Sequence, residues 1–314
     1  MESWLSVDGH ADVPALVRQK ALSRGEAGRQ WLAELPDLLA DLRQEWSLTL
    51  LDPLTGGSAA YVVRVRTADH QDAVVKLPIP GDDIAGQVRT IRDANGHGYV
   101  TLLAHDEQRR AILLESLGPS LERLGWPPER MIEVLADTLR QAWQVPAHTV
   151  AAQRERAAAL AQFVEELWAT LDHPCDERVV TQALRYAKRR SAAFDPDRCV
   201  VVHGDPHPGN ALRVTTPRVG AESGFVFVDP DGFLADPAYD CGVVQRDWCT
   251  ELLAGDPVSL ARKYCALLAD HTGIDATAIW EWGFLERVST GLYALSFGAE
   301  DMGGRFLRTA ELLV

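Results

Sequence analysis

The chain has 314 residues, 46% of them hydrophobic and 24% charged, and its formal net charge is −14. This length allows about two domains or one large bilobal unit, and the composition is typical of a globular protein with a substantial core. Nucleic-acid binding usually requires a basic patch, and the sequence has no Lys/Arg cluster beyond Lys188-Arg189-Arg190. The acidic balance would favour a cationic small substrate, although acidity that serves only solubility explains it equally well.

Cysteine usage and hydropathy predict a cytoplasmic protein. The five cysteines form no Cys-x-x-Cys pair, which favours reduced thiols over a disulfide framework or a zinc site. The start Met1-Glu2-Ser3-Trp4 lacks the basic region of a signal peptide. No apolar stretch reaches the ~18 residues that a membrane helix needs. We therefore expect neither a membrane nor a nucleic acid as a partner, and the sequence leaves the oligomeric state open.

The first third of the chain predicts a helical segment followed by a small sheet. Apolar residues recur at helical spacing over 11–45, which predicts a helical cap at 1–45. Tyr61–Thr67 and Ala73–Leu77 predict a hairpin, and a short helix over 84–94 follows it. Tyr99–Ala104 and Arg110–Glu115 predict two more strands. Residues 46–117 are thus interpreted as a small antiparallel-sheet lobe with one inserted helix.

Helical periodicity dominates the rest of the chain, over 118–314. The predicted helices begin at Pro127-Pro128 and continue at about 151–171, 177–193, 258–269, 276–295 and 304–312. Two short apolar runs interrupt them and end in polar loops. The predicted fold class is therefore α+β, with the sheet lobe first and a larger, mainly helical lobe after it.

Those two polar loops carry the chemistry that the sequence suggests. The first reads His203-Gly204-Asp205-Pro206-His207-Pro208-Gly209-Asn210, and the second reads Val228-Asp229-Pro230-Asp231-Gly232. Asp205 can accept a proton from a hydroxyl nucleophile. Asn210 and Asp229 offer the hard oxygen ligands that suit Mg²⁺. A base and two metal ligands of these types are what kinase-type phosphoryl transfer requires.

Candidates for binding a nucleotide lie upstream of these loops. Gly56, Gly57 and Ser58 form a turn between two predicted strands, where backbone N–H groups can approach phosphates. Lys76 follows two valines at the end of a strand and can hold phosphates, and the backbone of the Glu115–Leu117 connection can pair with adenine. Each of these features alone has an ordinary explanation, as a simple turn or a solvated lysine. Their order around the two polar loops is what favours ATP as a cofactor.

The first loop also allows a different interpretation, as a transition-metal site of a hydrolase. His203, Asp205 and His207 alternate as His-x-Asp-x-His, a spacing that can place several ligands together. A complete site needs further ligands, and the other histidines form no second cluster. We therefore prefer the phosphoryl-transfer interpretation.

The string His-Gly-Asp-x-His-x-x-Asn, followed by Val-Asp-Pro-Asp-Gly, resembles the aminoglycoside phosphotransferases, which are relatives of the protein kinases. Asp236–Asp240, after the second loop, also resembles that family. The segments 252–257 and 279–291 resemble the subgroup of aminoglycoside 6-phosphotransferases and hydroxyurea phosphotransferases. The resemblance covers nearly the whole chain and implies a bilobal, protein-kinase-like fold. It implies that Asp205 is the catalytic base, that Asn210 and Asp229 hold Mg²⁺, and that Lys76 binds ATP phosphates. It implies an architectural role for His203.

One position departs from the kinase pattern. Kinases pair the strand lysine with a glutamate on the next helix, and the inward position here is Gln87. Gln87 can hydrogen-bond Lys76 without neutralising it, or Asp82 or Asp83 can substitute. A weakly active nucleotide-binding pseudokinase that acts as a sensor is therefore kept as an alternative.

The acceptor is expected in the helical lobe near Asp205. Candidate contacts combine acids with tryptophans, which suits an amino or guanidino sugar through charge pairing and cation–π contact; they are Asp247, Trp248, Glu251, Trp280, Glu281, Trp282 and Glu286. Core tryptophans and solvated acids would give the same pattern. The expected acceptor is an aminoglycoside or aminocyclitol such as streptomycin, with another amino sugar, a small metabolite or hydroxyurea as alternatives. The choice between ATP and GTP stays open.

Overall fold

The structure is a computed structural model and describes residues 12–55, 57, 59–81, 83–147 and 156–314. The chain divides into two compact units. The first comprises the chain up to Gly96 together with Val100–Gly118, and the second comprises His97–Tyr99 together with Pro119–Val314. None of the described helices combines the length and apolar character needed to cross a membrane.

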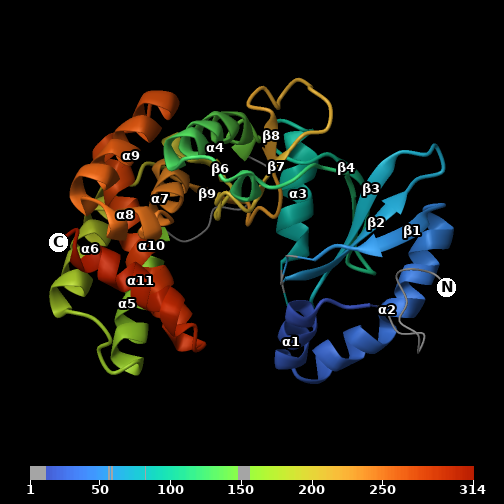
Figure 1. The fold of residues 1–314 in the computed structure, drawn as a ribbon, viewed down its shortest axis with the longest axis horizontal. Helices are drawn as coiled ribbons and strands as arrows, with labels where there is room; N and C mark the ends of the chain where they lie inside the picture. The colour runs from blue at the N-terminus through green and yellow to red at the C-terminus, as the bar shows by residue number, and fades with distance from the viewer. Residues whose placement is uncertain (1–11, 56, 58, 82, 148–155) are drawn as a thin grey trace. The chain divides into compact units, whose positions relative to one another are not determined.

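The first unit is a five-stranded antiparallel sheet with helices before and within it (Figure 1). The strand order is β1-β2-β3-β5-β4, which keeps the predicted hairpin at its centre. The elements are α1 (Ala15–Ser23), α2 (Glu26–Glu45), β1 (Thr49–Pro53), β2 (Ala60–Arg66), β3 (Asp72–Pro78), α3 (Ile84–Ala94), β4 (Leu102–Asp106) and β5 (Ala111–Glu115).

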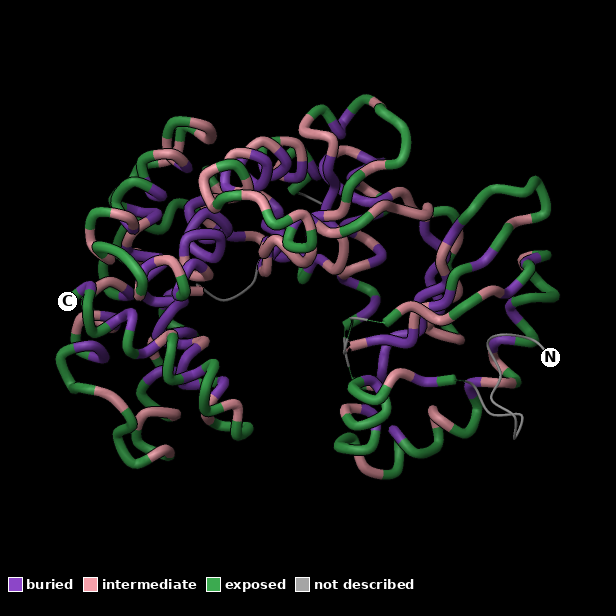
Figure 2. Tube along the Cα trace, in the orientation of Figure 1, coloured by how far each residue is buried: buried purple, intermediate pink, exposed green. Residues whose placement is uncertain are grey.

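Alternation along β2 and β3 builds the core of this unit. Val63, Val65 and Val75 are fully buried and share one hydrophobic cluster with Leu35 and Leu39 of α2. Burying each such side chain contributes about 1.5–3 kcal/mol, so the two N-terminal helices are integral to the sheet. Figure 2 shows purple, buried stretches of the chain in this unit beside green, exposed ones.

The second unit is mainly helical, and its long helix α10 (Ala276–Ser296) contacts α5, α6, α7, α9 and α11. α10 is buried nearly all round, as expected for a helix with little polar surface. The other helices are α4 (Pro128–Ala142), α5 (Arg156–Thr170), α6 (Glu177–Ala192), α7 (Ala238–Arg246), α8 (Cys249–Ala254), α9 (Pro257–Thr272) and α11 (Glu300–Glu311), with short 3₁₀ turns η1 (Leu121–Leu124) and η3 (Pro196–Arg198).

Two small antiparallel ribbons carry the polar loops. β6 (Val200–Val202) pairs with β9 (Phe233–Ala235), and β7 (Ala211–Arg213) pairs with β8 (Phe225–Phe227). The loop at 203–210 therefore joins one ribbon to the other, and the second loop returns between them. This arrangement brings both loops into one neighbourhood within the second unit.

The predicted strand at Tyr99–Ala104 is wrong in its first part, because β4 begins at Leu102. Gly98 has φ +68° and turns the chain, and Tyr99 forms a parallel bridge with Phe227 of the second unit. Gly98 N donates to Gly220 O at 2.7 Å, and Phe227 N donates to Gly98 O at 2.8 Å. An added Cβ at Gly98 would lie 2.3 Å from the backbone nitrogen of Ala142, so this close approach requires glycine.

Candidate active site

The loop after β6 is anchored by a buried carboxylate. Asp240, on α7, accepts hydrogen bonds from His203 N and Gly204 N, both at 2.9 Å. It accepts a third from Trp143 Nε1 at 2.9 Å. Burial raises the pKa of Asp240 to about 6, although these donors favour its ionised form. The start of the loop is therefore fixed to α7 through its backbone, independently of the side chains that follow.

His203 connects the two polar loops. Its fully buried ring stacks on Tyr99 at 5.9 Å between ring centres. Nδ1 accepts from Asp205 N at 3.1 Å, so the ring proton lies on Nε2, which donates to Val228 O at 2.9 Å. Burial lowers the pKa of His203 to about 4 and keeps the ring neutral. Since both ring nitrogens are used, His203 cannot be a metal ligand, and the hydrolase interpretation fails.

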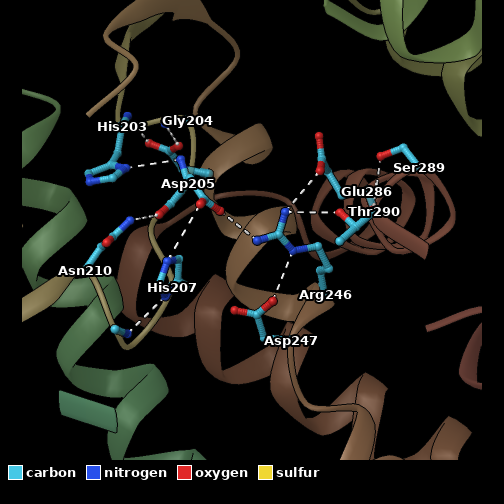
Figure 3. Close-up of polar contacts among 12 residues, drawn as sticks. His203, Gly204, Asp205, His207, Asn210, Arg246, Asp247, Glu286, Ser289 and Thr290 are labelled. Carbon is cyan, nitrogen blue, oxygen red and sulfur yellow. Dashed lines mark hydrogen bonds and ion pairs between the residues drawn. The ribbon is translucent and has the colours of Figure 1, made fainter. Parts of the chain in front are cut away.

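Asp205 presents a half-exposed carboxylate beyond this anchored backbone (Figure 3). Its Oδ1 accepts from Arg246 Nη2 at 2.7 Å, and its Oδ2 lies 3.7 Å from His207 Nε2. Burial would raise the pKa of Asp205, but the Arg246 guanidinium and His207 hold it below its ordinary value. The carboxylate is thus ionised at neutral pH, with Oδ2 the less constrained oxygen.

Arg246 was not among the residues predicted from the sequence. It is the last residue of α7, and its side chain is only 12% exposed. Besides Asp205, it contacts Asp247 Oδ1 at 3.0 Å through Nε, and Glu286 Oε2 and Thr290 Oγ1, both at 3.3 Å, through Nη1 (Figure 3). A signal for it existed, because an arginine that directly follows Val243-Val244-Gln245 on a buried helix needs acidic partners.

Asp231 is a second acid that the sequence interpretation left without a role. Its backbone N donates to His203 O at 2.8 Å. Its side chain lies against Gly204, where an added Cβ would approach Asp231 Oδ2 to 2.6 Å and where φ is +94°. Burial and the negative charge of Asp205 raise the pKa of Asp231 to about 6. The site thus gathers acids from both loops and from α10.

The two predicted metal ligands lie just beyond the β7–β8 ribbon, Asn210 directly before β7 and Asp229 shortly after β8. The pair Ala211↔Phe227 is extended by a hydrogen bond from Val228 N to Asn210 O at 2.9 Å. Asn210 Nδ2 donates to Asp205 O at 3.0 Å, so the amide oxygen is the atom it can offer to a cation. Asp229 has φ +60°, a left-handed conformation that a non-glycine residue adopts only when its surroundings impose it. One amide and one carboxylate oxygen fit Mg²⁺, which retains waters and takes further oxygens from phosphates.

The residues predicted to bind the nucleotide lie in the first unit. Lys76, on β3, is 7% exposed and donates to Gln87 Oε1 on α3 at 3.1 Å. Asp83 instead accepts from Gly86 N at 3.1 Å and caps α3. This geometry favours Gln87 as the helix partner of the lysine.

The remaining nucleotide-side predictions are less well defined. Gly56 and Ser58, like Asp82, lie outside the described residues. Gly57 is exposed, and an added Cβ there would have nothing within 4 Å. Glu115 Oε1 accepts from Thr101 N at 2.7 Å, so this side chain fixes the start of β4, while Leu117 follows in the connection.

The predicted acceptor contacts separate into two groups. Asp247 and Glu286 lie beside Arg246. Glu281, in contrast, is 2% exposed and pairs with Arg189 Nη1 at 3.0 Å and Arg190 Nε at 2.6 Å.

The tryptophans fall in the second group with Glu281. Trp282 is buried against Tyr239, at 5.2 Å between ring centres, and Trp280 Nε1 donates to Tyr186 at 3.2 Å. Trp248 is buried against Tyr264, while Glu251 lies on α8 with a half-buried side chain. These contacts place Glu281 and the tryptophans in packed surroundings, whereas Asp247 and Glu286 lie beside Arg246.

Comparison with known proteins agrees with this geometry. Residues 50–278 match the phosphotransferase enzyme family. The chain belongs to that family. It is 26% identical to streptomycin 6-kinase of Streptomyces glaucescens over 95% of both chains. It is 30% identical to hydroxyurea phosphotransferase of Kitasatospora aureofaciens, over 99% of this chain and 89% of that protein.

Solved structures show the same fold at low sequence identity. Plasmodium vivax ethanolamine kinase aligns with a TM-score of 0.60 at 12% identity, over 88% of this chain and 84% of the other. The aminoglycoside phosphotransferase APH(3'')-Id of Streptomyces rimosus aligns with a TM-score of 0.52 at 18% identity, over 82% of this chain and 98% of the other. The predicted family, the kinase-like α+β fold and the enzyme class, a small-molecule kinase, are confirmed.

Proposed function

We propose that this phosphotransferase uses ATP and Mg²⁺ to phosphorylate a hydroxyl of a cationic, polyhydroxylated small molecule, with a streptomycin-like aminoglycoside as the leading acceptor. The observation that carries this proposal is the ionised, half-exposed Asp205, whose backbone oxygen accepts from Asn210 Nδ2 and whose loop leads into the ribbon that Asp229 follows. The relatives named streptomycin 6-kinase support the acceptor class.

In the proposed mechanism, Asp205 Oδ2 accepts the hydrogen bond of the acceptor hydroxyl and points its oxygen toward the γ-phosphorus. As the new P–O bond forms and ADP leaves, the hydroxyl proton passes to Asp205. Asn210 and Asp229 would hold Mg²⁺, which when bound neutralises charge on the transferred phosphoryl group. Lys76 would bind the nucleotide phosphates, with Gln87 holding its ammonium in place.

The charge balance of the site supports a cationic acceptor. Asp247 and Glu286 flank Arg246, and Asp231 and Asp205 lie on the two loops. Arg156 adds a second positive charge, 3.9 Å from Glu286. Four carboxylates thus face two guanidiniums, and the surplus negative charge attracts amino or guanidino groups.

A coupled ADP-release assay tests the function. Purified protein with Mg-ATP is incubated with streptomycin, other aminoglycosides, amino sugars or hydroxyurea, and the product mass is checked for one added phosphoryl group. Acceptor-dependent ADP release is expected, and Asp205→Asn should lower kcat by about 10²–10⁴, the scale of general-base loss. Full turnover by Asp205→Asn would contradict the role of Asp205. Nucleotide binding without turnover on every acceptor would instead indicate the sensor function.

A further inference from the structure

One face of a helix in the second unit leads from the residues around Arg246 to a group of exposed aromatic side chains. Glu286, Thr290, Tyr293 and Phe297 follow one another at spacings of four, three and four, so they share one face of α10 and its C-terminal end. The first two contact Arg246 Nη1, which belongs to the guanidinium that holds Asp205. The same face therefore leads from the proposed base to the end of the helix.

The helix α5 runs beside this face in the same direction. Arg156 Nη2 lies 3.9 Å from Glu286 Oε1, and the rings of Phe163 and Tyr293 lie 6.1 Å apart. Each partner moves seven residues along its own helix between the two contacts, so these helices stay in register. Phe163 therefore widens the patch that Tyr293 begins. We call the three aromatic residues Tyr293, Phe297 and Phe163, together with the adjoining Thr290, the aromatic strip.

Exposure of the side chains rises steeply from Glu286 to the end of the strip. Glu286 is 4% exposed, whereas Tyr293 is 54% and Phe297 is 60% exposed. The rings of Tyr293 and Phe297 lie 5.1 Å apart at an interplanar angle of 67°. Neighbouring large aromatic side chains left open to solvent commonly mark a binding surface. At the rise of an α-helix, Tyr293 is about 10 Å and Phe297 about 16 Å along the axis from Glu286.

We propose that the aromatic strip binds a distal ring of the acceptor, one or two rings away from the hydroxyl held at Asp205. The proposal rests on the proposed function and adds to it a second, specificity-determining subsite. Aromatic faces attract ammonium and guanidinium groups and stack on apolar ring faces, so a cationic, polycyclic acceptor suits them. An acceptor as small as hydroxyurea can reach Asp205 but cannot span to Tyr293. The strip therefore selects for acceptors with several rings.

Calorimetry and kinetics on the full-length protein test this inference. The variants are Tyr293→Ala and Tyr293→Ala/Phe297→Ala, which remove exposed side chains and leave the buried face of α10 intact. Phe194→Ala, which removes a 41% exposed aromatic ring outside the strip, is the matched control. Streptomycin binding is measured without nucleotide, and KM and kcat are measured with streptomycin, hydroxyurea and ATP.

We expect the double variant to weaken streptomycin binding about tenfold and to raise its KM similarly, because each ring contributes a factor of about two to five. The kcat, the KM for ATP and any turnover of hydroxyurea should match the wild type, as should every parameter of Phe194→Ala. Unchanged streptomycin affinity in the double variant overturns the subsite, as does absence of streptomycin binding to the wild-type protein. A changed oligomeric state with unchanged affinity would assign the strip to contacts between copies and would also overturn it.

The two proposals fail in different ways. If the wild type binds streptomycin and the strip variants weaken that binding, the subsite stands even when no phosphorylated product forms. The absence of product would then contradict the proposed function alone.

Discussion

Arg246 Nη2 lies 2.7 Å from Asp205 Oδ1, so the proposed base is ion-paired with a buried guanidinium. The guanidinium is held in turn by Asp247, Glu286 and Thr290. This pairing leaves Oδ2 as the oxygen that can meet an acceptor. The orientation of the carboxylate is therefore set by α7 and α10 as well as by the loop that carries it.

Substitution of this guanidinium should lower kcat more than it raises KM for the nucleotide. Arg246→Lys keeps the charge but loses the planar fork that reaches several oxygens at once. We expect kcat to fall by about 10²-fold, the effect of misplacing a catalytic group by about 1 Å. Arg189→Lys is the matched control, since Arg189 pairs with Glu281 on the same helix α10. Steady-state kinetics on both variants, with circular dichroism to verify folding, make the measurement. Equal losses in the two variants would contradict a positioning role for Arg246.

Asp240→Asn should destabilise the protein and slow catalysis. The carboxylate accepts from His203 N, Gly204 N and Trp143 Nε1. An amide turns an NH₂ group toward these donors and leaves at least one unsatisfied, at about 1–3 kcal/mol. The free energy of unfolding, measured with urea, and kcat should both be lower than in the wild type. Asp236→Asn serves as the control, because Asn can still accept from Ala238 N, and stability within about 0.5 kcal/mol of wild type is expected. Wild-type stability of Asp240→Asn would argue against the anchor.

Folding stability should depend on pH through His203. Its pKa is about 4 in the folded protein, below the ordinary 6.5. As the pH falls below 6.5, the His203 ring is protonated in the unfolded chain but stays neutral in the folded chain. The folded state therefore loses stability on acidification. Between pH 7 and pH 5 this loss amounts to about 2 kcal/mol.

The His203 contribution can be isolated by comparison with His203→Gln. Wild type and variant are unfolded with urea at both pH values, so that contributions from other groups cancel in the difference. The variant should lose about 2 kcal/mol less than the wild type on acidification. Parallel pH profiles for the two proteins would mean that the ring is not held neutral in the folded state.

The contact between Lys76 and Gln87 predicts a graded effect on nucleotide binding. Gln87→Ala removes one hydrogen bond from the ammonium and should raise the KM for ATP by up to about tenfold with little change in kcat. Lys76→Met should have a much larger effect on kcat/KM for ATP. Lys263→Met, which removes an exposed lysine paired with Glu129, should behave as wild type. A Lys76→Met protein with wild-type ATP kinetics would contradict the assignment.

Local patterns predicted the parts of the fold that depend on neighbouring residues. The hairpin of β2 and β3 follows from alternation in one stretch of chain, and α3 from its spacing and its Asp83 cap. Tyr99 was assigned to a strand of the wrong unit, because its partners His203 and Phe227 lie more than a hundred residues away.

The same limit applies to the candidate site. Asp205, Asn210 and Asp229 stand in short motifs, so the sequence could single them out, and their roles stay predictions; Asn210 Nδ2 donates to Asp205 O. Arg246 lies outside both motifs, and Asp231 stands in the second motif without a predicted role; only tertiary structure brings them to Asp205. Glu281 and Glu286 are both glutamates of α10, but Glu281 forms ion pairs with Arg189 and Arg190 of α6, which is a structural contact.

The short excursion at His97–Tyr99 makes the chain cross between its two units three times, after Gly96, after Tyr99 and after Gly118. A fragment that begins at Pro119 would retain the proposed base and the metal ligands but would lack the tyrosine ring that stacks on His203. Neither unit is therefore formed by one continuous stretch of the chain. Fusions or split versions of this enzyme that cut at Gly118 would produce a helical half with an unfilled space beside the loop at 203–210.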